Sequence, residues 1–264
     1  MKKFIALLLA VLMLTACLTA CGSKAATLES VKKAGKLTIA TSPDFPPFES
    51  LVDGKVVGIE VEIMELICKD LGVEMDIKQM NFDSVLPGVQ AGKYDVGMSG
   101  ISVTPEREKN VKFSIPYCEA AQAIVVVEGS EIKGKADLTG KKISVQSGTT
   151  AEDFCTQSGY EVSSFAANAD AQTALVDGKV AAWVIDDLTA ADMVKTYNAS
   201  NPEKKLVILE EAMTTEPYAF AFSFEDEVLQ MKFNAEIEKL IENGKIAEIF
   251  AKYDAPYTAP TTAD

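Results

Sequence analysis

The sequence contains no histidine. This absence excludes Ser-His-Asp and Cys-His nucleophilic catalysis, and it excludes metal sites that depend on imidazole ligands. Cysteine is scarce as well, with five residues, and their spacings do not resemble a metal-binding motif. We therefore expect no metal and no cofactor, and any catalysis would have to depend on carboxylate, lysine, tyrosine or cysteine side chains.

Basic residues are also few, with 25 lysines and arginines against 39 aspartates and glutamates and a formal net charge of −14. Such a surface repels phosphate backbones, so we expect no nucleic-acid partner. The chain has 264 residues and is 48% hydrophobic, which is enough for one large or two modest globular domains.

The first residues are typical of a targeting segment. Lys2 and Lys3 precede an apolar run over residues 4–14, which is too short to span a bilayer. Small residues then precede Cys17 and again Cys21, and each ending resembles a bacterial lipobox, in which the cysteine is lipidated and becomes the first mature residue. We interpret residues 1–20 as a lipoprotein signal peptide and 21–30 as the tether, with Cys21 preferred over Cys17. The body is then expected outside the cytoplasm, anchored to the cell membrane by acyl chains.

Three cysteines remain beyond this segment. Cys68 falls on the apolar face of a predicted helix and is expected to be buried. Cys118 and Cys155 could pair with each other or could both be free.

Strand and helix patterns alternate along the body. Residues 36–41 predict a strand, and apolar spacing over residues 59–71 predicts a helix that ends at Gly72. Residues 219–224 predict a late strand. The apolar run at 123–127 starts the alternation afresh. We therefore expect an α/β fold of mostly parallel sheets in two lobes, with lobe 1 at 31–118 plus 214–254, lobe 2 at 119–213 and a mobile tail at 255–264.

Polar or aromatic turns follow five of the predicted strands. They begin near Phe45, Phe82, Ser99, Thr149 and Asp186. Ligands of open α/β sheets bind at the carboxyl ends of the strands, so these turns are expected to face one crevice. Thr149 with Glu152 also forms a capping box, which predicts that a helix starts there.

The turn from Ser99 to Arg107 combines hydroxyls, free backbone N–H groups and a guanidinium. Thr104 followed by Pro105 is a helix-start signal, which places Arg107 in the opening turn. There its planar fork can bind a carboxylate through two parallel hydrogen bonds, so the segment predicts a carboxylate clamp.

Several segments together resemble one protein family: Thr41–Glu49, Gly58–Leu71, Gly100–Arg107, Leu138–Thr150 and Ile241–Ile246. The chain is similar to the polar amino-acid-binding proteins of bacterial ABC importers, solute-binding protein family 3, which have the type II periplasmic-binding-protein fold. The resemblance implies two lobes, each a mostly parallel sheet flanked by helices, with the ligand cleft between them. It also implies a monomeric, non-enzymatic protein that closes on an L-α-amino acid and delivers it to an ABC permease.

The resemblance also implies a set of ligand-binding residues. Phe45 and Phe82 would be aromatic walls, Thr150 a lobe 2 donor to the ligand carboxylate, and Asp186 the partner of the ammonium. The full set comprises Phe45, Phe82, Ser99, Gly100, Ser102, Arg107, Thr149, Thr150 and Asp186.

Three positions are expected to face the ligand side chain: Ser42, Gln146 and Ile185. All are uncharged here, whereas relatives that bind basic or amide ligands often carry an acid or another polar group there. This favours a neutral or polar side chain, unless Asp44, Glu60 or Trp183 points inward. The alternative function is a carboxylate-assisted dehydratase of an aromatic acid on the same scaffold, with Asp186 or Asp187 as the acid.

Overall fold

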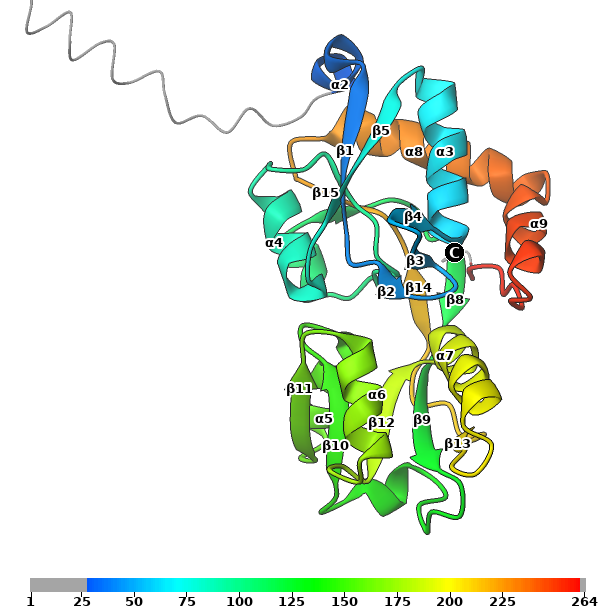
Figure 1. Ribbon diagram of the computed structural model, residues 1–264. Helices are drawn as coiled ribbons and strands as arrows, with labels where there is room; N and C mark the ends of the chain where they lie inside the picture. Colours follow the sequence, from blue (N-terminus) through cyan, green and yellow to red (C-terminus); the bar gives the residue numbers. More distant parts are fainter. Residues whose placement is uncertain (1–27, 262–264) are drawn as a thin grey trace, which may run out of the picture.

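The computed structural model describes residues 28–261 and has two lobes, each built on a five-stranded sheet (Figure 1). The predicted signal peptide, with Cys17 and Cys21, lies outside the described residues. Within those residues, none of the helices combines the length and apolar character needed to cross a membrane.

The lobe 1 sheet has the strand order β5-β1-β6-β15-β7. The first three strands are parallel, and β15 runs antiparallel to both β6 and β7. Strand bounds are Glu74–Gln79 for β5, Lys36–Thr41 for β1, Val96–Gly97 for β6, Ala221–Phe222 for β15 and Lys112–Phe113 for β7. The lobe also contains helices α2 (Leu28–Ala34), α3 (Ile59–Leu71), α4 (Val85–Gln90), α8 (Glu227–Glu242) and α9 (Lys245–Lys252), and a short sheet of β2 (Asp44–Phe45), β3 (Glu49–Val52) and β4 (Lys55–Val57).

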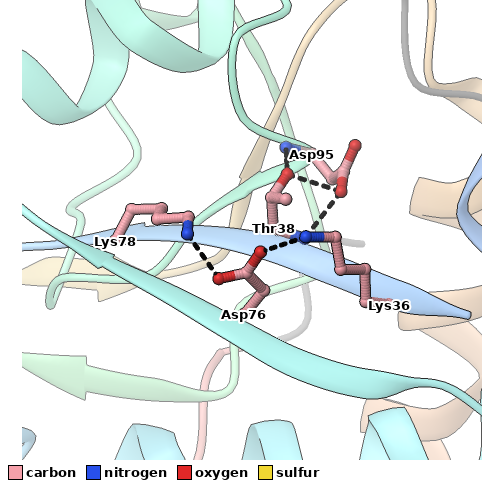
Figure 2. Close-up of polar contacts among 5 residues, drawn as sticks. All are labelled: Lys36, Thr38, Asp76, Lys78 and Asp95. Carbon is pink, nitrogen blue, oxygen red and sulfur yellow. Dashed lines mark hydrogen bonds and ion pairs between the residues drawn. The ribbon is translucent and has the colours of Figure 1, made fainter. Parts of the chain in front are cut away.

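Polar contacts fix the register of β1 against its neighbours (Figure 2). Asp76 of β5 accepts from Lys36 Nζ at 2.7 Å and lies 2.6 Å from Lys78 Nζ. On the other side of β1, the backbone N and the hydroxyl of Thr38 both donate to Asp95 Oδ2 at 2.6 Å. Exposed ion pairs stabilise a fold little, so the importance of these contacts is geometric: they align the carboxyl ends of β1 and β6.

The lobe 2 sheet repeats this arrangement in the order β11-β10-β12-β9-β13. Again three neighbouring strands are parallel and the fourth in the order, β9, is antiparallel. The bounds are Glu161–Phe165 for β11, Lys142–Gln146 for β10, Ala182–Asp186 for β12, Gln122–Val127 for β9 and Leu206–Ile208 for β13, with helices α5 (Thr150–Gln157), α6 (Asn168–Val176) and α7 (Asp187–Ser200). The expected two-lobe, mostly parallel α/β fold is confirmed.

Two antiparallel strands connect the lobes. β8 (Cys118–Ala120) leads into lobe 2, β14 (Glu216–Tyr218) leads back, and they pair with each other. The prediction of one strand over 219–224 is wrong in extent, because only Ala221–Phe222 pairs as strand β15. Before it, Ala219 N donates to Ile101 O and Phe220 N to the Ser114 hydroxyl, outside the sheet ladder.

The described cysteines are all buried and unpaired, so Cys118 and Cys155 do not form a disulfide. Trp183 is also fully buried and belongs to the core.

The part of the tail that the structure describes packs on lobe 1. Glu119 N donates to Thr258 O at 3.0 Å, and the Tyr257 ring lies 5.1 Å from that of Phe250. Mobility of the tail stays a prediction, and these contacts are the ones that motion of residues 255–261 would have to break.

Candidate functional site

A narrow cavity of about 10 Å³ lies between the lobes. Its lining consists of Phe45, Phe82, Ser99, Gly100, Ser102, Arg107, Gln146, Thr149, Thr150 and Asp186. The structure thus brings together the nine residues expected to bind the ligand and one of the three expected around its side chain. Ser42 and Ile185 are buried but are not among the lining residues.

In the part of the cavity wall that lobe 1 forms, the backbone of Gly100 lies close to an aromatic ring. Gly100 has a φ of +53°, and a Cβ built there would lie 2.5 Å from the Phe45 ring. Any side chain at this position would displace the ring from the cavity wall, so the glycine is required both by its backbone conformation and by the packing.

Arg107 reaches across the cavity from lobe 1. Its backbone N donates to Thr104 Oγ1 at 3.2 Å, although the expected helix start develops only into a 3₁₀ turn at Arg107–Lys109. The guanidinium donates to Ser102 O at 2.9 Å and to Gly148 O of lobe 2 at 3.1 Å, and it lies 5.5 Å from the centre of the Phe82 ring. Burial lowers its pKa while the negative charges of nearby acids oppose this, and an arginine remains cationic at neutral pH.

Asp186 supplies a carboxyl group from lobe 2, at the carboxyl end of β12. It is 6% exposed, and it accepts from Gln122 Nε2 at 2.8 Å and from the Tyr218 hydroxyl. Burial raises its pKa to about 8, and the charge of Glu216 adds to this effect. The hydrogen-bond partners of this carboxyl group therefore include no cation. A ligand ammonium group would supply the missing positive charge.

Glu216 is a site residue that sequence reasoning missed. It is buried in the connecting strand β14 and accepts hydrogen bonds from the hydroxyls of Ser102, Thr150 and Thr214. Ser102 and Thr150, expected to contact the ligand, are therefore both oriented by this carboxylate. Its local sequence resembles an exposed loop, and only the pairing of β14 with β8 places it under the cavity.

The start of α5 forms the lobe 2 rim. Thr149 Oγ1 accepts from Glu152 N at 3.2 Å, as the capping box predicts, and the Glu152 carboxylate accepts from Gly148 N rather than from Thr149. Thr150 occupies the first helical position, where backbone N–H groups without helical partners favour an anion.

Asp44 connects the lobes beside the cavity. This β2 residue accepts from Gln146 Nε2 at 3.0 Å and from Asn168 N, the first residue of α6, at 2.9 Å. It also accepts from the Ser42 hydroxyl at 2.9 Å. The amide of Gln146 is therefore engaged within the protein. Ser42 contacts the cavity wall indirectly, through Asp44 and through its backbone N, which donates to Ser99 Oγ at 3.1 Å.

Ser99 and Gly100 are held from behind by two acids. The Ser99 hydroxyl donates to Glu49 Oε1 at 3.0 Å, and Gly100 N donates to Glu60 Oε2 at 2.9 Å. Glu60 is fully buried, whereas its place at a helix start is more typical of a solvated acid. In the part of the chain that the structure describes, no group of histidine, cysteine or acidic side chains is arranged to hold a metal ion.

The model of the bacterial extracellular solute-binding proteins, family 3, matches residues 37–255. The chain belongs to this family, as its resemblance implied. The arginine-binding extracellular protein ArtP of Bacillus subtilis is 31% identical over 257 residues, covering 96% of this chain and 98% of ArtP. The L-cystine-binding protein TcyJ of Escherichia coli K12 is 30% identical over 231 residues, covering 86% of this chain and 85% of TcyJ.

Among solved structures, the P235GK mutant of ArgBP from T. maritima superposes with a TM-score of 0.79 at 36% identity, covering 86% of this chain and 98% of the other. These similarities confirm the type II fold. The relatives are named as binding proteins and not as enzymes, and the chain is a solute-binding protein of the same family.

Proposed function

We propose that this protein is an extracytoplasmic binding protein that closes on an L-α-amino acid and delivers it to an ABC permease. The observation that carries the proposal is the placement of a guanidinium, Arg107, and a carboxyl group, Asp186, from opposite lobes on one cavity. The names of its relatives, which bind arginine and cystine, support the ligand class.

The physical chemistry of a zwitterion fits this arrangement. A buried α-amino acid loses its hydration, so its carboxylate and its ammonium both need charged partners. Arg107 and the start of α5 suit the carboxylate, and Asp186 suits the ammonium. Since these groups lie on both lobes, only the closed form makes all of the contacts, and the ligand favours closure.

The cavity favours a neutral or polar ligand side chain. Gln146 is uncharged and lines the cavity. The acid nearest to it, Asp44, is occupied by donors from lobe 2. Neither residue leaves a free carboxylate directed at a basic side chain. Cystine has no net positive charge on its side chain and fits this preference, whereas arginine has a basic side chain and does not. The two relatives are named for these two different ligands.

The N-terminal pattern supports a lipid anchor at Cys21, with delivery by a monomer held near its permease. Mass spectrometry of the membrane-bound protein should find a diacylglyceryl thioether on Cys21. Modification of Cys17 instead would move the anchor by four residues and leave the binding function unchanged.

A thermal-shift screen across the proteinogenic amino acids and cystine tests the proposed function. We expect a rise in melting temperature with one or a few neutral L-amino acids, and no rise with their N-acetyl derivatives, which lack the ammonium. A protein that ignores every free amino acid would contradict the proposal.

Replacement of Arg107 by alanine should weaken binding of the identified ligand by about 2–5 kcal/mol, because it leaves the ligand carboxylate without its charged partner. Isothermal titration calorimetry measures the loss. Lys109→Ala is the matched control, since this nearby cation is exposed and pairs with Glu106. Equal affinities of the two variants would remove Arg107 from the site.

A further inference from the structure

Two glutamates lie in contact beneath the ligand cavity. Glu49 begins β3 and Glu60 lies in the first turn of α3, and both side chains are 0% exposed. The two carboxyl groups are close enough to interact, because the charge of Glu60 raises the pKa of Glu49. Neither forms an ion pair with a lysine or arginine in residues 28–261. Two ionised carboxylates cannot share such a site without a large electrostatic penalty.

The chain brings them together through a tight junction at the start of α3. Gly58 has a φ of +147°, and a Cβ there would lie 2.1 Å from Phe48 O. The carbonyls of Pro47 and Phe48 accept from Ile59 N at 2.9 Å and Glu60 N at 3.1 Å, so the loop after β2 caps the helix. This capping places Glu60 next to Glu49, which follows Phe48 directly.

The donors around the pair are unequal. Both oxygens of Glu60 have one: Gly100 N at 2.9 Å and Tyr117 Oη at 2.6 Å. For Glu49, Oε1 accepts from the Ser99 hydroxyl at 3.0 Å, while Oε2 is buried without a donor. A carboxylate is stabilised by donors at both oxygens, whereas an unpartnered buried oxygen suits a protonated O–H group.

We propose that Glu49 and Glu60 are an acid–carboxylate pair that shares one proton, carried by Glu49, and that this pair positions Ser99 and Gly100 for the ligand. Ionised Glu60 holds the Gly100 backbone, and neutral Glu49 holds the Ser99 hydroxyl. Both held residues line the cavity. The pair is a positioning device, since neither glutamate is among the lining residues.

The electrostatic surroundings support this distribution of charge. Burial raises the pKa of Glu49 well above its ordinary value, and the negative charge of Glu60 raises it further. Burial raises the pKa of Glu60 as well, but the hydrogen bonds from Tyr117 and Gly100 oppose this effect and favour its carboxylate. The other titratable groups that face the pair are Asp44, Tyr117 and Cys118. Burial raises the pKa of Tyr117 and of Cys118, so both stay neutral, and Asp44 adds only negative charge.

Two isosteric variants test the assignment. In Glu49→Gln, the amide N–H can donate to Glu60 and its oxygen can accept from Ser99, so we expect ligand affinity within about twofold of wild type. In Glu60→Gln, an amide N–H₂ faces Gly100 N or Tyr117 Oη, and we expect affinity to fall about 10- to 100-fold, as for loss of a charge-assisted hydrogen bond. A larger loss of affinity in Glu49→Gln than in Glu60→Gln would overturn the proposal.

Two further readouts do not depend on ligand. In infrared spectra at neutral pH, the wild-type minus Glu49→Gln difference should contain the C=O stretch of a protonated carboxyl group. Because folded Glu49 keeps a proton that the unfolded chain releases, it contributes stability that is lost as the pH rises through its folded pKa. Denaturant unfolding should therefore show a loss of stability as the pH rises from the ordinary glutamate value of 4.5 toward the folded pKa of Glu49, and this loss should be smaller in Glu49→Gln.

The binding readout rests on the proposed function, but the other two do not. If infrared and stability results agree with the pair while neither wild type nor variant binds any amino acid, the proposed function fails and the pair stands. The pair would be overturned by a difference spectrum without the protonated carboxyl band, or by identical dependence of stability on pH in wild type and Glu49→Gln. Either result would do so even if ligand binding is normal and even if Glu60→Gln does not fold.

Discussion

Asp186 is the residue whose charge we expect to depend most directly on the ligand. Its pKa of about 8, raised first by burial and then by Glu216, keeps most of the carboxyl groups protonated at pH 7 before an ammonium arrives. An ammonium in contact favours the carboxylate and lowers that pKa. Capture of an amino acid should therefore expel a proton from the site.

We predict that binding at pH 7 releases close to one proton, and that affinity rises with pH up to about 8, where Asp186 is ionised beforehand. Calorimetry in buffers with different ionisation enthalpies measures the released proton. Asp186→Asn should bind weakly and without this buffer dependence. An enthalpy that is the same in all buffers would contradict the assignment of Asp186 to the ammonium.

The same raised pKa of Asp186 makes the free energy of unfolding fall with rising pH, whereas ligand affinity rises. Folded Asp186 retains a proton up to pH about 8, whereas an unfolded aspartate loses it near its ordinary value of 3.8. The folded protein without ligand should therefore lose stability as the pH rises between these values. Ligand offsets this loss, so stabilisation by ligand should be larger at pH 8 than at pH 5.

Among the helices, α5 has the most direct effect on the site, because its first turn carries Thr150. Thr149 fixes that turn by accepting from Glu152 N and by donating to Gln146 O at 2.7 Å. We predict that Thr149→Ala lowers the free energy of unfolding by about 1 kcal/mol, as for loss of a helix N-cap, and also weakens ligand binding. Urea unfolding and calorimetry measure the two effects.

Thr156→Ala is the matched control for this helix, since Thr156 is exposed and lies in its last turn. It should leave both quantities nearly unchanged. If Thr149→Ala destabilises the fold but binds ligand normally, the cap supports the helix without ordering the site.

Elements with a strong local pattern could be predicted closely. β1 spans Lys36–Thr41 and α3 spans Ile59–Leu71, as alternation, apolar spacing and Gly72 indicated. Strand β14, which leads back to lobe 1, could not be predicted from its local sequence. It forms by pairing with Cys118–Ala120, about a hundred residues earlier in the chain. The site residues on strand ends were predictable because open α/β sheets bind ligands at one edge.

The buried acids behind the site could not be predicted in this way. Glu49, Glu60 and Glu216 are typical surface residues by composition, and each is buried because donors distant in sequence face it. No local period reveals such partners. Contacts between the lobes are still harder to predict from the sequence, since they depend on how two folded lobes meet.

In the whole molecule, the repeated strand order explains how the lobes can move. Each sheet takes its antiparallel strand, β15 or β9, from a segment that has just crossed between lobes. The connection is thus confined to β8 and β14 on one side (Figure 1). At the cavity the lobes meet through side chains, including Arg107 with Gly148 O and Asp44 with Asn168 N.

Asp44 should therefore act on the balance between closed and open forms. Its carboxylate accepts two lobe 2 donors, one of them at the positive N-terminus of α6, and such charge-assisted bonds contribute roughly 1.5–3 kcal/mol each. We predict that Asp44→Ala enlarges the radius of gyration measured by small-angle X-ray scattering without ligand, and that saturating ligand restores the wild-type value. Affinity should fall about 10- to 100-fold, because the binding-competent closed form becomes a smaller fraction.

Asp170→Ala separates this effect from a general loss of charge at α6. Asp170 is an exposed acid in the first turn of the same helix, but it belongs to lobe 2 and does not span the cleft. Its removal should weaken the helix terminus slightly and leave the radius of gyration unchanged. If both variants expand equally, local destabilisation of α6 is responsible. If neither variant expands, the Asp44 contact adds too little free energy to shift the equilibrium between open and closed forms. Closure then depends on the ligand and the connecting strands.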